Sequence, residues 1–151
     1  MQPLPVRSLR TVLFALAVGQ AFLAGLVAFL RTNHGAFGVD PAPDALTLVV
    51  ALVFVGTAVT CLFFQSAAKK ALLADRDGAR LHVKGGSVPP ALARAAIVGA
   101  ALAEGSGLLA VVVVLIGGPL LLFAVPAASV IWIVLLVPSQ ERLENHLKDM
   151  G

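Results

Sequence analysis

The sequence predicts an all-α, polytopic membrane protein in which four transmembrane helices form an up-down bundle with the N and C termini in the cytoplasm. Its composition, with 59% hydrophobic and 13% charged residues and a mean hydropathy of +0.96, leaves too little polar surface for a water-soluble protein. At about 1.5 Å per residue, each of four apolar runs is long enough to cross a hydrocarbon core of about 30 Å. These runs cover residues 11–30, 45–64, 95–116 and 119–137.

The positive charges lie almost entirely on one side of these runs. Ten of the eleven Lys and Arg residues precede the first run, follow the fourth or lie in the loop 65–94, and Arg31 alone lies on the other side. Cytoplasmic loops of membrane proteins carry this excess of Lys and Arg. We therefore expect a multi-pass protein of the bacterial inner membrane whose loop 65–94 is cytoplasmic. Because no connecting segment can form a soluble core, residues 1–151 are expected to form one domain.

The first half of the chain carries several helix boundaries. Residues 11–30 are expected to be an uncleaved signal-anchor, because twenty apolar residues exceed the roughly 7 to 15 of a cleaved secretion signal. The sequence Asp-Pro-Ala-Pro-Asp at 40–44 ends a helix, and Asp44 is placed to cap the second span. The Ala- and Leu-rich residues 66–81 can continue that span as a helix, whereas residues 84–90 hold two glycines and two prolines that break it.

The third and fourth spans are expected to form a helical hairpin. The Gly-Gly-Pro sequence at 117–119 predicts a tight turn between them, with proline at the first helical position. Pro126 lies inside the fourth span and has no N–H for the carbonyl of Leu122, which predicts a kink. The cytoplasmic tail 138–151 either forms a short helix on the membrane surface or is a solvated end.

One carboxyl group lies deep inside a predicted span. Glu104 is twelve residues from the outer end of the third span, about 18 Å along the helix and close to the middle of the bilayer. A charged side chain there costs roughly 2.5–3.5 kcal/mol or more, so Glu104 is expected to be protonated, paired or next to water. Other polar side chains fall at similar depths and are expected to converge with it as a candidate buried polar or ion site. They are Gln20, Thr57, Ser106 and Ser129.

Small residues predict where the helices approach one another. They recur at every fourth position in two spans, which lets helix backbones come into contact in lipid. The third span has Ala95, Gly99, Ala103 and Gly107, and the first span has Ala17, Ala21 and Gly25. We therefore expect spans one and three to cross near Gln20 and Glu104, where a protonated Glu104 can donate to the Gln20 carbonyl oxygen.

Several function classes find no support in the sequence. The cations are not interleaved with the aromatic residues that nucleic-acid-binding surfaces use, so we expect no nucleic-acid partner. His34, His82 and His146 lie in separate loops, and Cys61, the only cysteine, has no histidine at its depth. Neither a metal site nor a nucleophile with its base can be assembled from them. We therefore expect no metal, no cofactor and no enzymatic activity, and an enzyme acting on lipid is the least supported class.

A local resemblance concerns the third span. Residues 99–104 read Gly-Ala-Ala-Leu-Ala-Glu and continue through Leu108 into the apolar residues 111–116. This segment resembles the ion-binding helix of the ATP synthase c subunit. The resemblance implies that Glu104 binds a proton or a sodium ion in mid-membrane.

A broader resemblance rests on short motifs spread along the chain. They are Leu9-Arg10, Phe14-Ala15-Leu16, Gly19-Gln20, Glu104-Gly105, Gly117-Gly118, Pro138-Ser139 and Glu141-Arg142-Leu143. In these motifs the sequence looks like a family of small four-span bacterial inner-membrane proteins of unknown function. That resemblance implies the architecture derived above and brings no activity with it.

Two functions therefore remain open. In the first, the chain is an integral membrane protein of unknown biochemical activity, a small accessory or scaffold protein whose polar layer holds the helices together. Its partners are then the lipid bilayer and a second copy or another membrane protein. In the second, the chain is an oligomeric proton- or cation-coupled small transporter that uses Glu104, since ionisable residues at this depth usually serve a function.

Overall fold

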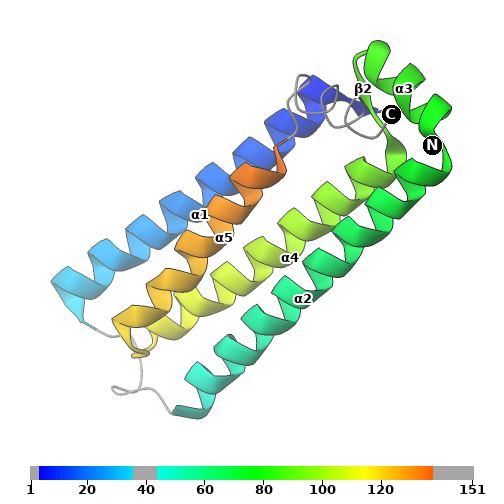
Figure 1. Ribbon diagram of the computed structural model, residues 1–151. Helices are drawn as coiled ribbons and strands as arrows, with labels where there is room; N and C mark the ends of the chain where they lie inside the picture. Colours follow the sequence, from blue (N-terminus) through cyan, green and yellow to red (C-terminus); the bar gives the residue numbers. More distant parts are fainter. Residues whose placement is uncertain (1–3, 36–43, 138–151) are drawn as a thin grey trace.

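The computed structural model describes residues 4–35 and 44–137 of the 151-residue chain. These residues are almost entirely helical, and the long helices run alongside one another (Figure 1). The elements are β1 (Leu4–Pro5), α1 (Val6–His34), α2 (Asp44–Ala74), α3 (Arg76–Lys84), β2 (Ser87–Val88), α4 (Pro90–Leu115), the 3-10 helix η1 (Leu120–Phe123) and α5 (Ala124–Leu136). The predicted all-α class is confirmed for this part of the chain, apart from the short strand pair, which was not predicted.

Three helices are long and apolar enough to cross a membrane. They are α1, α2 and α4, with 29, 31 and 26 residues. The last apolar segment is shorter, because it consists of four residues of η1 and thirteen of α5. Several helices extend past the predicted runs: α1 starts at Val6, α2 continues to Ala74 and α4 starts at Pro90.

The central helix of the fold is α4. It packs against α1, α2 and α5, and 50% of an 18-residue apolar stretch within it is buried. The helices α1 and α5 also pack on each other, whereas α2 packs mainly on α4, and only 11% of its corresponding stretch is buried. Because α2 touches little besides α4, it leaves a broad apolar face uncovered.

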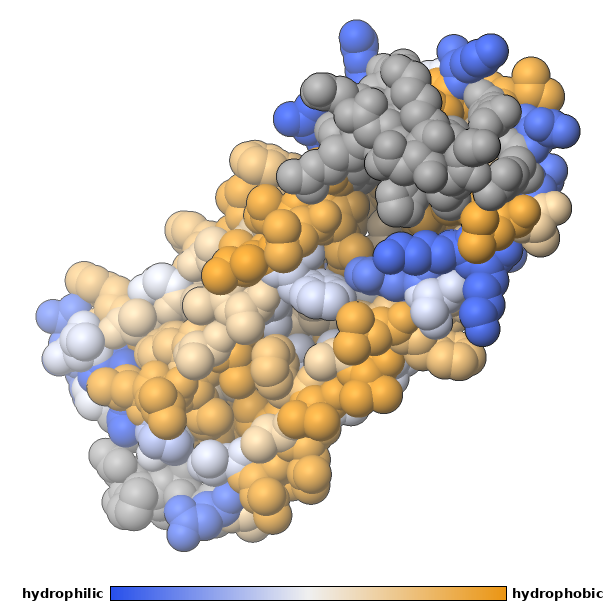
Figure 2. Space-filling view, viewed as in Figure 1, coloured by the Kyte–Doolittle hydropathy of each residue, from blue (hydrophilic) through white to orange (hydrophobic). Residues whose placement is uncertain are grey.

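Large apolar side chains cover the outward faces of the helices. Phe14, Phe22 and Phe29 of α1 and Leu52 and Phe63 of α2 are between 61% and 72% exposed. Figure 2 shows this apolar surface, with hydrophilic residues gathered mainly toward the two ends of the molecule. Water-soluble monomers rarely expose so large a continuous apolar surface, whereas lipid tails cover it without cost.

The start of α1 and the connection from α2 to α4 meet at one end of the molecule (Figure 1). There β1 pairs antiparallel with β2, and the N–H of Val6 donates to the carbonyl of Gly86 at 3.2 Å. The short helix α3 lies in the same connection, and the carboxylate of Asp75 caps it by accepting from the N–H of Gly78 at 3.2 Å. Gly86 has a φ of 69°, a conformation that glycine adopts without strain.

The charges separate in space as they do along the chain. The cations toward the end that holds β1 and β2 include Arg7, Arg10, Lys69, Lys70, Lys84 and Arg94. Arg31 lies near the last turn of α1, at the opposite end. The helix directions therefore bring positive charges that are distant in the sequence to one end of the molecule.

The turn between α4 and η1 is tight, as predicted, but the proline lies at a different position. Gly117 has a φ of 120°, and the N–H of Gly118 donates to the carbonyl of Val113 at 2.8 Å. Pro119 precedes the first residue of η1 instead of occupying the first helical position. Its extended backbone directs the chain out of the turn before the helix begins.

The helix type changes just before Pro126, where the sequence predicts a kink. The segment starts as η1, and regular α-helix begins only at Ala124. Pro126 has no N–H to offer the carbonyl of Leu122, so a full α-helical ladder cannot form at this point. A 3-10 turn, which bonds three residues apart, accommodates the missing donor. Two predictions, the helix-ending residues 40–43 and the tail 138–151, lie outside the described residues.

Candidate functional site

Gln20 lies in the interior of the fold, where α1 meets α4 and α5. Its side chain is 1% exposed. A Cβ atom on Gly107 of α4 would overlap the Gln20 amide nitrogen and would lie 3.3 Å from the Cα of Pro126 in α5. The missing side chain at Gly107 therefore makes the room that Gln20 occupies.

The expected hydrogen bonds between helices are not formed among the described residues. Neither Nε2 nor Oε1 of Gln20 has a partner there, and Oγ of Ser129 is also buried without one. The Ser106 hydroxyl donates to the carbonyl of Ala103 on its own helix at 2.9 Å. Helical serines commonly bond back to the preceding turn in this way, which uses up the hydroxyl proton. Packing, and not hydrogen bonding, is what joins these polar side chains across the helices.

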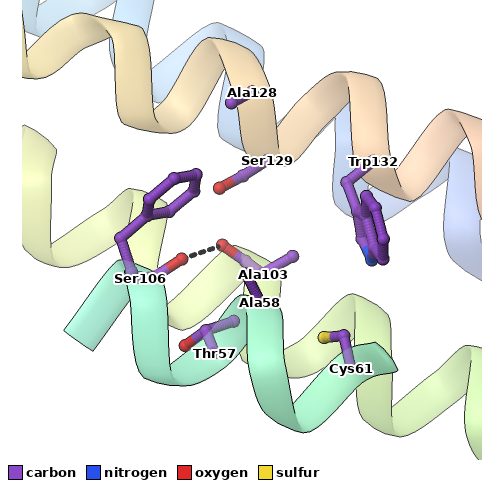
Figure 3. Close-up of a pocket in the computed structure, with 9 residues that line it drawn as sticks. Thr57, Ala58, Cys61, Ala103, Ser106, Ala128, Ser129 and Trp132 are labelled. Atoms are coloured by element: carbon purple, nitrogen blue, oxygen red, sulfur yellow. Dashed lines mark hydrogen bonds between the residues drawn. The ribbon is translucent and has the colours of Figure 1, made fainter. Parts of the chain in front are cut away.

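Three of the predicted polar residues line one groove. Thr57 of α2, Ser106 of α4 and Ser129 of α5 all lie on its walls, together with Cys61 and Trp132 (Figure 3). The groove has a volume of about 200 Å³. Because α2 packs mainly on α4, the groove remains between α2 and α5.

One close contact between α2 and α4 lies beside this groove. The Cys61 thiol points at the carbonyl of Gly99 at 3.6 Å, within the range of a weak sulfur hydrogen bond. A Cβ on Gly99 would lie 3.8 Å from that sulfur and 3.3 Å from Cδ1 of Leu136. Because Gly99 has no side chain, α2 and α5 can both approach α4 closely at the height of this residue.

Glu104 does not line this groove and is not hydrogen-bonded to Gln20. Its side chain is half-buried, and no hydrogen bond or ion pair joins it to another residue in the described ranges. It borders a stripe of exposed α4 residues that includes Ala101, Gly105 and Val112. Because successive residues of an α-helix are rotated by about 100°, Glu104 is turned about 60° away from Gly107, which faces Gln20. The predicted hydrogen bond from Glu104 to Gln20 is therefore not formed.

The stripe of small residues is buried on α4 but only partly buried on α1. The α4 stripe is buried along its length, at Ala95, Gly99, Ala103 and Gly107. In α1, Ala17 is buried but Ala21 and Gly25 are exposed, so that part of the prediction is wrong. Leu13 and Gln20 face inward instead. Leu13 and Gln20 are seven residues apart and so lie on nearly the same side of the helix. Ala17, Ala21 and Gly25 are four apart, and each step of four rotates the position by about 40°, so Ala21 and Gly25 turn away from the interior.

Trp132 and Cys61 were not among the predicted site residues, although both line the groove. The sequence did contain a signal for Trp132, because it follows Ser129 by three positions and so lies on the same side of the helix. No comparable signal marks Cys61, whose inward direction depends on how α2 rotates against α4. In the described ranges, no three His, Cys, Asp or Glu side chains gather as a metal site would require.

The chain matches no protein-family model, and comparison with curated proteins and with solved structures gives no match. The resemblances to the ATP synthase c subunit and to a family of small four-span proteins gain no support from these comparisons. No residue role is therefore carried over from them. The chain has the helices of an integral membrane protein.

Proposed function

We propose that this protein is a small accessory or scaffold protein of the bacterial inner membrane, with four spans and both termini in the cytoplasm. Three helices of spanning length support the membrane placement. The packing of α5 along α4 and α1, with Leu136 beside Gly99, supports a fourth span. The cations gathered at the end that holds β1 and β2 support the orientation, because Lys and Arg are retained on the cytoplasmic side.

The observation that carries the structural role is the position of Gln20 over Gly107. A fully buried amide that fits against a glycine fills the space between α1, α4 and α5. Close packing of this kind is the main force that joins helices in lipid, where apolar side chains gain nothing by leaving the solvent. The polar layer then serves to fix α1 on its neighbours.

Glu104 and the exposed stripe of α4 supply a contact surface for a second copy of the chain. A Cβ on Gly105 would meet no atom within 4 Å, so another helix can approach closely there. A carboxyl group that faces lipid is costly. Pairing two protonated Glu104 side chains across a two-fold axis satisfies both of them. We therefore propose that the scaffold functions as a homodimer and that the exposed stripe of α4 forms the dimer contact.

A second candidate is an oligomeric proton- or cation-coupled small transporter that uses Glu104. One observation favours it: Glu104 is half-buried near the middle of its span and has no partner in the described ranges. An ionisable side chain at that depth is a functional hypothesis in its own right. In an oligomer of this kind, each copy of α4 would contribute one carboxyl group to a shared pathway.

Disulfide cross-linking tests the proposed contact. Cys61→Ala removes the only cysteine of the chain. In that background, Gly105→Cys places a thiol on the α4 stripe, and Val134→Cys places one on the exposed face of α5, where Val134 is 50% exposed. Oxidation in native membranes is expected to join the Gly105→Cys variant into dimers and to leave the Val134→Cys variant monomeric. Equal cross-linking of the two variants, or none at Gly105→Cys, contradicts the proposed contact.

A further inference from the structure

We infer that the groove between α2, α4 and α5 binds an uncharged, lipid-soluble molecule that carries carbonyl oxygens, of which a quinone head group is the best-fitting kind. The ligand enters from the bilayer, because the groove is only partly enclosed and the outward faces of α2 and α5 beside it are apolar. This inference goes beyond the scaffold role. It depends only on the membrane placement of the helices and not on Glu104.

Two buried hydrogen-bond donors in the groove walls have no strong partner among the described residues. Oγ of Ser129 has no partner there, and Nε1 of Trp132 has only the Cys61 thiol, a weak acceptor, near it. Ser129 is itself 1% exposed. Figure 3 shows both side chains extending from α5 toward α2 and α4. Burying a hydrogen-bond donor without a strong acceptor is costly, so a ligand that accepts from Ser129 Oγ or Trp132 Nε1 is stabilised when it binds.

The remaining lining excludes a charged ligand. It consists of the Thr57 and Ser106 hydroxyls, the Cys61 thiol, the Phe54 ring and three alanines, with no charged side chain among the residues that line the groove. An ion in such surroundings would lose its hydration without gaining a counter-charge. Carbonyl oxygens accept hydrogen bonds and carry no charge, and a flat conjugated ring can also stack against the Trp132 indole.

The depth of the groove in the bilayer determines which carbonyl-bearing molecules can reach it. Ser129 lies ten residues into the fourth run, or about 15 Å from its outer end and near the middle of the bilayer. The ester carbonyls of phospholipids remain at the interface, because they need water or head groups nearby. A quinone with an apolar tail moves freely within the hydrocarbon region. Its head therefore reaches Ser129 and Trp132 where a phospholipid carbonyl does not.

Trp132 provides its own probe of this binding. The chain has one tryptophan and no tyrosine, so its intrinsic fluorescence reports on Trp132 alone. A quinone quenches indole fluorescence when the two are in contact. We would add decyl-ubiquinone to the purified protein in phosphatidylcholine liposomes, which contain no other protein, and measure the quenching against quinone content. A bound quinone is expected to give a saturable component, whereas random collisions in the bilayer give quenching that rises linearly.

Three variants distinguish quenching by a bound quinone from quenching by random collisions. Ala128→Leu fills the groove from α5 and is expected to abolish the saturable component. Ala127→Leu, the matched control, adds the same volume at the neighbouring exposed position and is expected to keep it. Ser129→Ala removes one donor and is expected to weaken binding about three- to tenfold, the equivalent of one hydrogen bond. Because its hydroxyl has no partner, this substitution is expected to leave the fold unchanged, which circular dichroism checks.

Two results would overturn the inference. The first is quenching that is linear and equal in the wild type, Ala127→Leu and Ala128→Leu, which would mean that no site exists. The second is displacement of the quinone by decylbenzene, which has no carbonyl oxygen, at the same concentration as by a second quinone. That result would show that the groove accepts any apolar molecule and that its donors do not select the ligand.

Discussion

The amide nitrogen of Gln20 occupies the space that a Cβ atom on Gly107 would fill. This contact joins α1 to α4 at a level where Pro126 of α5 is also close, so one glycine determines how three helices meet. A side chain at Gly107 must displace either the amide or the backbone of α5. The Gln20 side chain cannot move aside into open space, because it is buried, with 1% of its surface exposed.

Alanine substitutions at two neighbouring glycines test this contact. Both Gly107→Ala and Gly105→Ala gain helix propensity, by about 1 kcal/mol each, so the propensity cancels in the comparison. Only Gly107→Ala is overpacked, and we expect it to be about 1–3 kcal/mol less stable than Gly105→Ala. Reversible unfolding in mixed detergent micelles measures the difference. Equal stability of the two variants would show that Gln20 is not held against α4.

Substitutions of Gln20 itself distinguish packing from hydrogen bonding. Because both polar atoms lack partners among the described residues, Gln20→Leu, which keeps the volume, is expected to be neutral or stabilising by about 1–3 kcal/mol. Gln20→Ala leaves a cavity and is expected to destabilise the fold by about 2 kcal/mol or more. The free energy of unfolding of both variants is the measurement. A large loss of stability in Gln20→Leu would reveal a bound water or ion that the amide holds.

Single-cysteine labelling determines the orientation. In the Cys61→Ala background, Asn33→Cys lies on an exposed position at the outer end, and Leu81→Cys lies on α3, where Leu81 is 72% exposed. With the cation-rich end in the cytoplasm, a membrane-impermeant maleimide is expected to label Asn33→Cys in intact spheroplasts. It should label Leu81→Cys only after permeabilisation. The reverse pattern would invert the topology, and labelling of both in intact spheroplasts would mean that both orientations exist.

The sequence was sufficient to predict the helical class, the separation of charges and the inward direction of Gln20. It did not predict the rotation of Glu104. Counting residues gives the height of a side chain along a helix. A step of three residues, from Glu104 to Gly107, leaves the two side chains about 60° apart around the helix axis, and this difference decides whether a side chain faces a neighbouring helix or the edge of the bundle. That choice depends on which helix packs beside α4.

The groove was unpredictable for a related reason. The second span is apolar on all sides, so no polar face indicates how α2 rotates or how few neighbours it has. Its contact with α4 includes Cys61 against Gly99, two residues that belong to no recognisable sequence pattern. The chain between Thr57 and Trp132 is long, and only the packed structure shows that these two residues line one groove.

Ion flux through the purified protein tests the structural role of Glu104 most directly. Wild-type protein and Glu104→Gln would be reconstituted into liposomes and followed with fluorescent indicators under imposed proton, sodium and potassium gradients. A scaffold predicts that neither preparation exceeds protein-free liposomes. It also predicts that the two unfold with equal stability, since a glutamine amide can hydrogen-bond to its counterpart across the proposed contact as a protonated glutamate does. Wild-type flux that Glu104→Gln abolishes would contradict the scaffold role and establish the transporter instead.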